Sequence, residues 1–257
     1  MRSQTLVFAL LIAISGYAQG ATLARSAGLE FKSEPISNLL TQQTVIQIFQ
    51  DSRGLIWILT QEGIAKYNGF ILENFKYSTS DSNSISSNFV TRMAEDAEGV
   101  LWISTIGGGL NRYNPADNSF SALYSSARGG NSPLSNDIHT VFRDRSGTLW
   151  LGYQNEFSAY NPSTNQFTHY IPQNEGLPPL GIVIWFDQTS DGTVWAATKA
   201  GLLEINPETQ KLSLHQQSEA YQNSLSSIDL MGVMADKKGR LWAFSKNKGV
   251  AVLSPDG

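Results

Sequence analysis

The segment from Gln47 to Tyr67 reads QIFQDSRGLIWILTQEGIAKY, and the segment from Glu95 to Pro115 reads EDAEGVLWISTIGGGLNRYNP. Each contains an Asp, a Gly three residues later, and a Trp three residues after the Gly. Further along the chain this spacing returns, so that the full copies are Asp51-Gly54-Trp57, Asp96-Gly99-Trp102, Asp144-Gly147-Trp150 and Asp236-Gly239-Trp242. In one more copy, ending in Gly192 and Trp195, Thr189 replaces the Asp and Asp191 precedes the Gly. The chain is therefore built from five copies of one repeat.

Successive tryptophans of the repeat are 45, 48, 45 and 47 residues apart, which is the length of four short strands with their turns. A second element follows each Trp: a Gly in four of the five copies, then an apolar residue and a turn, as in Gly109-Leu110 before Asn114-Pro115. Asp, Gly and Asn-Pro at the ends of short links are typical of tight turns. The pattern predicts an all-β fold, a β-propeller of four-stranded blades.

We expect one propeller domain over residues 21–257, with five units whose bounds are about 45–75, 89–124, 137–170, 182–215 and 228–253. The last unit ends before its fourth strand, whereas residues 29–31 resemble a fourth strand with no other strand before it. An N-terminal strand that completed the last blade would cover exposed strand edges. We therefore predict that residues 29–31 close a ring of five blades, or of more blades if the natural chain is longer.

The repeated tryptophans have two interpretations. They could form a platform for a ligand, or they could pack between neighbouring blades. Burial of about 200 Å² of each ring is worth up to roughly 5 kcal/mol per blade. We favour the packing role for this reason.

Composition and charge exclude several classes of function. The chain has 18 basic and 22 acidic residues, a net charge of −4 and no basic cluster, which argues against nucleic acid or anionic lipid as a partner. It contains no cysteine, so disulfides are excluded. Residues 1–20 read as a secretory signal, with Arg2, an apolar run from Leu6 to Ile14, and small Ala18 and Gly20 before the expected cleavage site. We predict export to the periplasm.

The two quoted segments resemble the two-component regulator propeller repeat, and the resemblance extends over residues 29–257. It implies a periplasmic sensor region of a receptor whose output module is a histidine kinase or a diguanylate cyclase. The family's propellers usually have seven blades, and a membrane helix and the output module usually follow them. This sequence has five units and no output module, so we expect either a chain truncated before its output domain or a shortened stand-alone relative, and we favour the truncation.

Candidate binding residues are predicted on the face of the propeller that carries the variable loops. Ten residues before each Trp, on the predicted innermost strand, the residue type changes from copy to copy; these positions are Gln47, Arg92, Thr140, Trp185 and Gly232. The next position is always apolar and is expected in the core: Ile48, Met93, Val141, Phe186 and Val233. Links between the second and third strands add Glu62, Asn155 and Lys199 as candidates.

Arg92 and Trp185 are the strongest of these candidates, because a guanidinium and an aromatic face near a channel could hold a carboxylated or sugar-like ligand. The alternative is that Trp185 fills a gap and Arg92 pairs with a neighbouring acid. His139, His169 and His215 show none of the close pairing in the sequence that is expected of a metal site, and we expect no cofactor. No catalytic residues are predicted.

Three functions remain as hypotheses. The leading one is a sensor module that binds a small molecule or oligosaccharide and passes the event to a C-terminal output module or a partner receptor chain, with a homodimer as a further form of assembly. The second is a stand-alone periplasmic scaffold that binds protein. The third, a propeller lyase or hydrolase, needs a cluster of acidic, basic or metal-binding residues that the sequence does not reveal.

Overall fold

The computed structural model describes residues 40, 42, 44–126, 130–216 and 229–253. These residues form nineteen β-strands and one short 3-10 turn, η2 (Pro172–Glu175), and they contain no α-helix. The predicted signal segment 1–20 and the predicted closing strand 29–31 lie outside the described residues.

The strands pair in chain order, and all pairs are antiparallel. The first sheet contains β1 (Val45–Gln50), β2 (Ile56–Thr60), β3 (Gly63–Tyr67) and β4 (Leu72–Phe75), and the second contains β5 (Val90–Glu95), β6 (Leu101–Thr105), β7 (Leu110–Asn114) and β8 (Ser119–Leu123). The third contains β9 (Thr140–Arg143), β10 (Leu149–Gly152), β11 (Phe157–Asn161) and β12 (Gln166–Tyr170). The fourth contains β13 (Val183–Gln188), β14 (Val194–Thr198), β15 (Gly201–Ile205) and β16 (Leu212–His215). Within the described residues the fifth sheet has three strands, β17 (Leu230–Ala235), β18 (Leu241–Ser245) and β19 (Gly249–Leu253).

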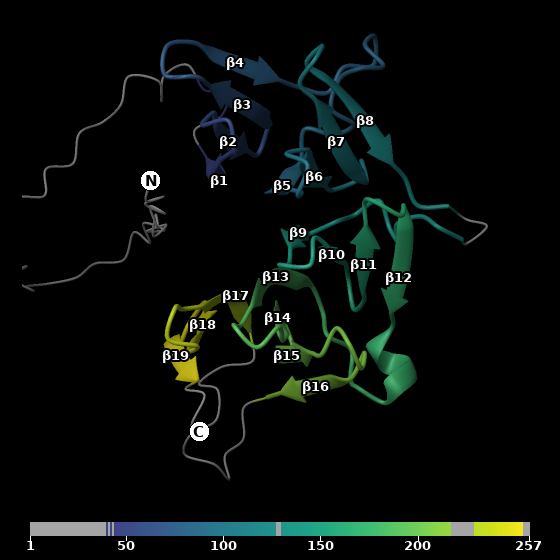
Figure 1. Cartoon of the computed structure of the whole chain (residues 1–257), viewed down its shortest axis with the longest axis vertical. Helices are drawn as coiled ribbons and strands as arrows, with labels where there is room; N and C mark the ends of the chain where they lie inside the picture. Colours follow the sequence, from purple (N-terminus) through teal and green to yellow (C-terminus); the bar gives the residue numbers. More distant parts are fainter. Residues whose placement is uncertain (1–39, 41, 43, 127–129, 217–228, 254–257) are drawn as a thin grey trace, which may run out of the picture. The chain divides into compact units, whose positions relative to one another are not determined.

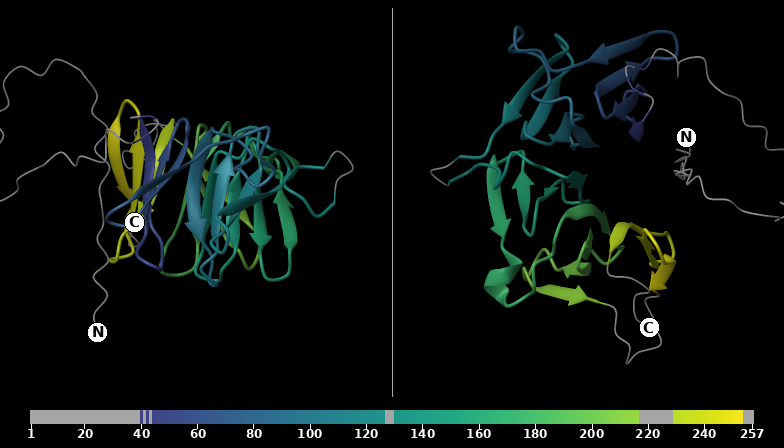
Figure 2. Two further views of the ribbon diagram at one scale, coloured as in Figure 1. Left: turned by 90° about the horizontal axis from the view of Figure 1, so that it is seen from above. Right: turned by 180° about the vertical axis from the view of Figure 1, so that it is seen from behind.

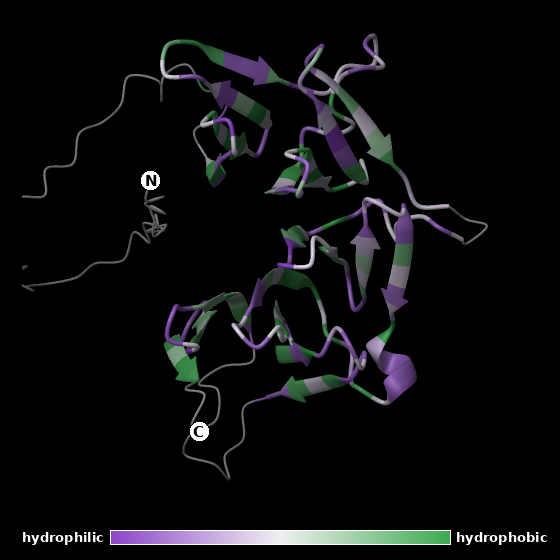
Figure 3. Cartoon of the chain, in the orientation of Figure 1, coloured by the Kyte–Doolittle hydropathy of each residue, from purple (hydrophilic) through white to green (hydrophobic). Residues whose placement is uncertain are grey.

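Within residues 35–257, the five sheets follow one another around a common centre, with the first strand of each sheet innermost (Figure 1). Neighbouring first strands contact each other in the order β1, β5, β9, β13 and β17. The view from above shows the strands running between the two faces of this arrangement (Figure 2). The central strands β13 and β17 are largely hydrophobic, whereas η2 is hydrophilic (Figure 3). The predicted all-β propeller with four-stranded blades is confirmed.

The Asp of the repeat organises the turn between the first and second strands of each sheet. In the first copy, Asp51 Oδ1 accepts hydrogen bonds from the backbone N–H groups of Arg53 (3.0 Å) and Leu55 (2.9 Å). Its second oxygen, Oδ2, accepts a bond from the indole Nε1 of Trp57 at 3.0 Å. Gly54 adopts φ +87°, a conformation that glycine tolerates best. The Asp thus joins the turn to the Trp, a contact that the spacing of the repeat does not by itself indicate.

The copy that lacks this Asp reaches the same result with two residues. Thr189 Oγ1 accepts the indole hydrogen bond of Trp195 at 3.1 Å and donates to Asp191 Oδ1 at 2.7 Å. Asp191 Oδ1 also accepts a hydrogen bond from the backbone N–H of Thr193 at 3.1 Å. The displaced Asp of the fourth copy therefore supports the Trp through the threonine hydroxyl.

The repeated tryptophans pack between neighbouring sheets. Trp57, Trp102 and Trp150 are 0%, 4% and 1% exposed. Each lies against an aromatic ring of the following sheet, and the centroid distances are 4.8 Å for Trp57–Tyr113, 5.4 Å for Trp102–Tyr160 and 6.2 Å for Trp150–Phe186. The predicted packing role is confirmed for these three copies, whereas Trp195 and Trp242 are only partly buried.

One core prediction is wrong. Ile48 was expected in the core with its four equivalents, but its exposed fraction is 59%. Met93 and Phe186 show the reason, because each packs in a cluster with the Trp of the preceding sheet, Trp57 and Trp150 respectively. Among the described residues no sheet precedes β1, and Ile48 therefore lacks that neighbour.

The glycine that begins the third strand is required by close packing of the fourth strand. Gly63 has φ +118°, and a Cβ at this position would collide with the carbonyl oxygen of Phe75. Gly109, with φ +71°, faces the carbonyl of Leu123 in the same way. The glycine of the repeat thus allows the hairpin to turn and the outer strand to pair closely.

Asp51 gives the first turn a pH dependence. Burial alone would raise the pKa of this carboxyl, but the hydrogen bonds from Trp57 and Arg53 and the positive charge of Arg53 outweigh burial and lower the pKa. A lowered pKa in the folded state gives stabilisation that is present above about pH 4, the ordinary value for an unfolded Asp, and is lost as the pH falls through the folded value. We therefore expect the thermal midpoint of Asp51→Asn to depend less on pH below about pH 4 than that of the wild type. Thermal unfolding followed by circular dichroism checks this, and parallel pH profiles would contradict it.

Candidate ligand site at the hub

A cavity of about 400 Å³ lies at the hub, lined by the first strands of four sheets. Four of the seven candidate binding residues line it, one from each of β1, β5, β9 and β13: Gln47, Arg92, Thr140 and Trp185. They hold the same position in their repeats, ten residues before the Trp. The fold therefore places the most variable residue of each of these four innermost strands around one cavity.

A β-bulge precedes this position in four of the five sheets. The strand register shifts just before Gln47, Arg92, Trp185 and Gly232. A bulge bends the strand and changes the direction of the side chain that follows it. In the third sheet the paired strand simply begins at Thr140. The sequence contains no residue pattern from which we predicted these bulges.

Arg92 and Trp185 contact each other across the hub, although they belong to the second and fourth sheets. The guanidinium carbon Cζ of Arg92 lies 4.1 Å from the centroid of the Trp185 ring, a favourable cation–π distance. Gly232 is next to the same ring, since a Cβ built there would lie 3.7 Å from it. The small side chains of Thr140 and Gly232 leave room for the large Trp185. Both residues were predicted as candidates, but their contact was not predicted.

The charge of Arg92 is not neutralised by an acid. Its Nη1 donates one hydrogen bond, to the backbone carbonyl of Ile46 at 3.1 Å, and no carboxylate among the described residues pairs with it. Burial lowers the pKa of Arg92 to about 10, so the group stays protonated at neutral pH. The predicted alternative of an ion pair with a neighbouring acid is thus not observed, whereas Trp185 does pack against the core of the fifth sheet. The remaining donors of Arg92 can bind an anion.

A second guanidinium, that of Arg143, lines the same cavity. At the equivalent position in the second sheet, the carboxylate of Glu95 accepts hydrogen bonds from the backbone N–H (2.8 Å) and the hydroxyl (2.6 Å) of Ser52. In the third sheet this position is Arg143, whose buried Nε has no hydrogen-bond partner. Arg143 was not among the predicted candidates, although it is the one Arg among the five residues that stand seven before each Trp of the repeat.

Gln47 is the member of the site that the backbone holds most tightly. Its Oε1 accepts a hydrogen bond from the N–H of Met93 at 2.8 Å, and its Nε2 donates to the carbonyl of Met93 at 3.2 Å. These bonds join the first strands of two neighbouring sheets. Gln47 therefore fixes the wall of the cavity.

The other three candidates do not line the hub cavity. Glu62 lies 3.3 Å from Lys76, Asn155 accepts a hydrogen bond from the N–H of Gly181 at 2.8 Å, and Lys199 lies 2.5 Å from Asp229. Asn155 and Lys199 thus connect the loop between the second and third strands with the loop that leads into the next sheet. These two kinds of loop therefore lie on the same face.

The histidines have structural surroundings. His169 Nδ1 hydrogen bonds with Ser158 Oγ at 2.9 Å, and His215 Nε2 lies 2.8 Å from Glu204 Oε2. Burial lowers the pKa of His139. Across the described ranges, no group of three or more His, Asp or Glu residues could hold a metal ion. In those same ranges no helix has the length and hydrophobicity to cross a membrane.

The fold is a β-propeller, and its hub cavity is lined by two arginines, Arg92 and Arg143. A family model described as the two component regulator propeller matches residues 84–107, which confirms the resemblance predicted from the sequence. A comparison of the sequence with curated proteins gave no significant match.

Three solved structures illustrate the fold. An extracellular domain from B. thetaiotaomicron, described as part of a one-component system, has a TM-score of 0.65 and 17% identity, covering 82% of this chain and 27% of its own length. The extracellular domain of a protein described as a hybrid two-component system, from the same organism, has a TM-score of 0.54 and 19% identity, covering 83% of this chain and 40% of its own. PorZ, a surface component of the type-IX secretion system of Porphyromonas gingivalis, has a TM-score of 0.61 and 15% identity, with 82% and 33% covered. The chain thus spans between a quarter and two fifths of these structures, and the likeness shows the fold.

Proposed function

We propose that this chain is the ligand-binding propeller of an exported bacterial signalling receptor, and that a small anionic ligand binds in the hub cavity. The match of residues 84–107 to the two-component regulator propeller and the fold shared with extracellular domains of signalling systems support the receptor role. The observation that carries the ligand site is the guanidinium of Arg92, which has a stacking partner but no neutralising acid among the described residues.

The hub chemistry favours a ligand with a carboxylate. A guanidinium forms paired hydrogen bonds with a carboxylate, and partial burial strengthens such bonds because less water competes for them. Arg143 adds a second positive charge to the lining, and Glu95 is already hydrogen bonded to Ser52. The ring of Trp185 limits the free rotation of Arg92, so the ligand meets a partly ordered group.

Signalling requires that the ligand favours one arrangement of the receptor over another. Arg92, Trp185 and Gly232 belong to the second, fourth and fifth sheets. An anion bound to Arg92 weakens the cation–π interaction between Arg92 and Trp185, which links these sheets. The output module would lie in a further part of the receptor or in a partner chain. The chain itself acts by binding and carries out no catalysis.

Titration of the full chain with small acids tests this proposal. We would use calorimetry with succinate, glutamate and galacturonate, each beside an uncharged analogue, and follow the indole N–H signal of Trp185 by NMR. We expect an acid to bind and to shift that signal. Arg92→Met should weaken binding by roughly 10- to 100-fold, since hydrogen bonds to charged groups contribute about 1.5–3 kcal/mol.

Two variants make the result specific. Arg92→Lys keeps the charge but loses the planar fork, so it should bind the acid more weakly than the wild type and more tightly than Arg92→Met. Lys237→Met removes an exposed cation from a distant turn and should leave the affinity unchanged. Absence of binding by every acid, or equal affinities of the wild type and Arg92→Met, would refute the proposed site.

A further inference from the structure

A second cavity, of about 420 Å³, lies between the second and third sheets, away from the hub residues. Its walls include Trp102 and Tyr160, and its polar lining includes Arg112, Ser121 and Asn165. The repeat allows a direct comparison with the equivalent place between the first and second sheets.

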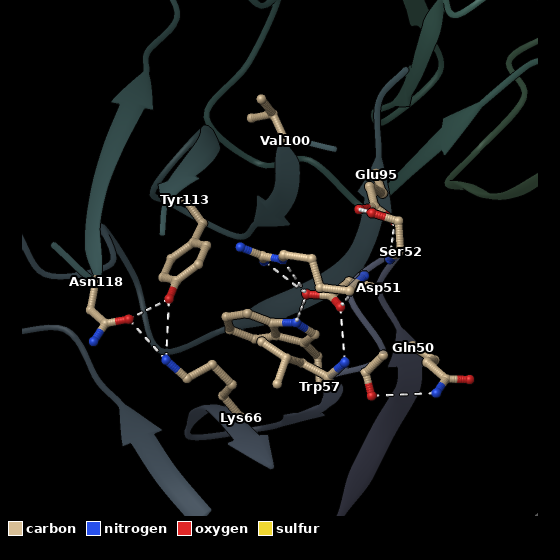
Figure 4. Close-up of polar contacts among 12 residues, drawn as sticks. Gln50, Asp51, Ser52, Trp57, Lys66, Glu95, Val100, Tyr113 and Asn118 are labelled. Carbon is tan, nitrogen blue, oxygen red and sulfur yellow. Dashed lines mark hydrogen bonds and ion pairs between the residues drawn. The ribbon is translucent and has the colours of Figure 1, made fainter. Parts of the chain in front are cut away.

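The first junction is filled and neutralised by the protein itself. Lys66 Nζ lies 2.6 Å from Glu73 Oε2, and it hydrogen bonds to Asn118 Oδ1 at 2.8 Å and to the hydroxyl of Tyr113 at 3.2 Å. Figure 4 shows Lys66 reaching Tyr113 and Asn118 beside Trp57. Asn118 Nδ2 donates to Glu73 Oε1 at 3.3 Å, so the carboxylate joins the cation to the amide.

An aromatic ring completes the first junction. The ring belongs to Phe75 on the outer strand β4, and the strand register places it opposite Ile64 of β3. The ring centroid of Phe75 lies 6.0 Å from those of Trp57 and Tyr113, and Lys66 Nζ lies 5.2 Å from it. Glu73 and Phe75 are two residues apart on β4, on the same side of the strand.

The second junction keeps the cation and loses both the acid and the ring. In the first sheet, Trp57 pairs with Lys66, and Lys66 pairs with Glu73. In the second sheet, Trp102 pairs with Arg112, and Arg112 pairs with Ser121. Ser121 therefore stands where Glu73 stands in the first sheet. By the same alignment Leu123, which pairs with Leu110, replaces Phe75. Ser is smaller than Glu and Leu is smaller than Phe, so both replacements free the space that the cavity occupies.

Two exposed side chains at this cavity, Arg112 and Asn165, carry donors that have no acceptor among the described residues. Arg112 lies over Trp102 at 5.9 Å from the ring centroid, and it makes no hydrogen bond or ion pair among the described residues. Tyr160 donates to Asn165 Oδ1 at 3.1 Å, as Tyr113 donates to Asn118, but Asn165 Nδ2 has no acceptor in the described structure. A cation and an amide thus flank the place where the first junction has a carboxylate.

We propose that the second junction binds an aryl carboxylate, whose carboxylate takes the position of Glu73 and whose ring takes that of Phe75. The chain's own first junction serves as the template, because it supplies both groups from one strand. The spacing of two residues along a strand suits a ring and a carboxylate joined by a short aliphatic link. This site is separate from the hub and does not rest on the proposed function.

Glu98 is the group that opposes an anion here. It lines the same cavity, at the position that Arg53 occupies in the first turn, and it forms no ion pair with Arg112 in the described structure. Asp96 also lines the cavity, but its oxygens accept hydrogen bonds from Trp102 Nε1 and the backbone. Glu98→Gln should therefore tighten the binding of an aryl carboxylate severalfold.

The test is a titration of the full chain with 3-phenylpropanoate, followed by the indole N–H signals of its six tryptophans. We expect a saturable shift of the Trp102 signal and none of the Trp185 signal, which reports on the hub. The matched neutral probe 3-phenylpropanamide has nearly the same shape and should bind roughly tenfold more weakly. Absence of a saturable Trp102 shift, or equal binding of the two probes, would overturn the proposal.

Variants that copy the first junction give the sharpest result. Ser121→Glu combined with Leu123→Phe should fill the cavity from within and abolish the Trp102 shift. Arg112→Gln should weaken binding by roughly tenfold and decides the question if the double variant does not fold. Lys237→Met serves again as the control and should bind like the wild type. Unchanged binding by the filled variant, or by Arg112→Gln, would contradict the assignment.

Discussion

Trp150→Ala is expected to lower the free energy of unfolding by about 3–5 kcal/mol, the usual cost of removing a large aromatic side chain from a core. Trp150 is 1% exposed, and its ring lies 5.8 Å from Tyr170 and 6.2 Å from Phe186 of the next sheet. The substitution leaves a cavity between two sheets and removes the group to which Asp144 is bonded. Equilibrium denaturation in urea measures the loss.

The fourth copy of the repeat supplies the matched control. Trp195 is only partly buried, lies 5.5 Å from His215, and donates its indole hydrogen bond to Thr189 instead of an Asp. Trp195→Ala should therefore cost clearly less than Trp150→Ala, about 1–3 kcal/mol. Equal losses for the two variants would show that inter-sheet burial does not decide the stability of the ring.

The repeat made the fold predictable, because spacing, turn residues and apolar positions recur five times and agree with one another. The turn from Asp96 to Gly99, for example, joins β5 to β6, which begins one residue before Trp102. The exposure of Ile48 was missed for a different reason. The residue type at this position indicates a core, but burial depends on a neighbouring sheet that a local pattern does not describe.

For the hub, the sequence predicted which residues line it but not how they contact each other. Counting back from each Trp found Gln47, Arg92, Thr140 and Trp185, and the structure places all four around one cavity. The contact between Arg92 and Trp185 depends on two bulges and on the small size of Thr140 between them, and these are properties of the assembled ring. Glu62 and Lys199 were chosen from variable links, and each has an oppositely charged neighbour outside the hub.

The two cavities arise at places where one copy of the repeat differs from the others. Each sheet repeats the same backbone contacts, so a substitution at one position leaves the fold intact and changes only one junction. At the hub an Arg stands where the other copies have Gln, Thr, Trp or Gly, and at the second junction a Ser stands where the first sheet has Glu. In both places the unmatched group is a guanidinium. Differences between the copies therefore mark candidate sites more directly than the shared residues do.

Asp144→Ala is expected to cost about 3–4 kcal/mol, although it removes only a short side chain. Asp144 is 3% exposed, and its carboxylate accepts hydrogen bonds from the backbone N–H groups of Ser146 (2.9 Å) and Thr148 (3.0 Å) and from Trp150 Nε1 (2.8 Å). Without the acceptor, the indole N–H of Trp150 stays buried and unbonded. Chemical denaturation, with the indole signal of Trp150 as a local probe, measures the effect.

The fourth copy of the repeat shows how the indole hydrogen bond can be made without this Asp. In the fourth copy Thr189 accepts the indole bond and Asp191, two residues later, holds the threonine hydroxyl. The combination of Asp144→Thr with Ser146→Asp transfers that arrangement to the third copy, and it should recover about half of the stability that Asp144→Ala loses. Asp144→Thr alone lacks the supporting acid and should recover less. If the double variant is no more stable than Asp144→Ala, then the carboxylate acts through the turn rather than through the tryptophan, because only the indole acceptor is fully restored by the exchange.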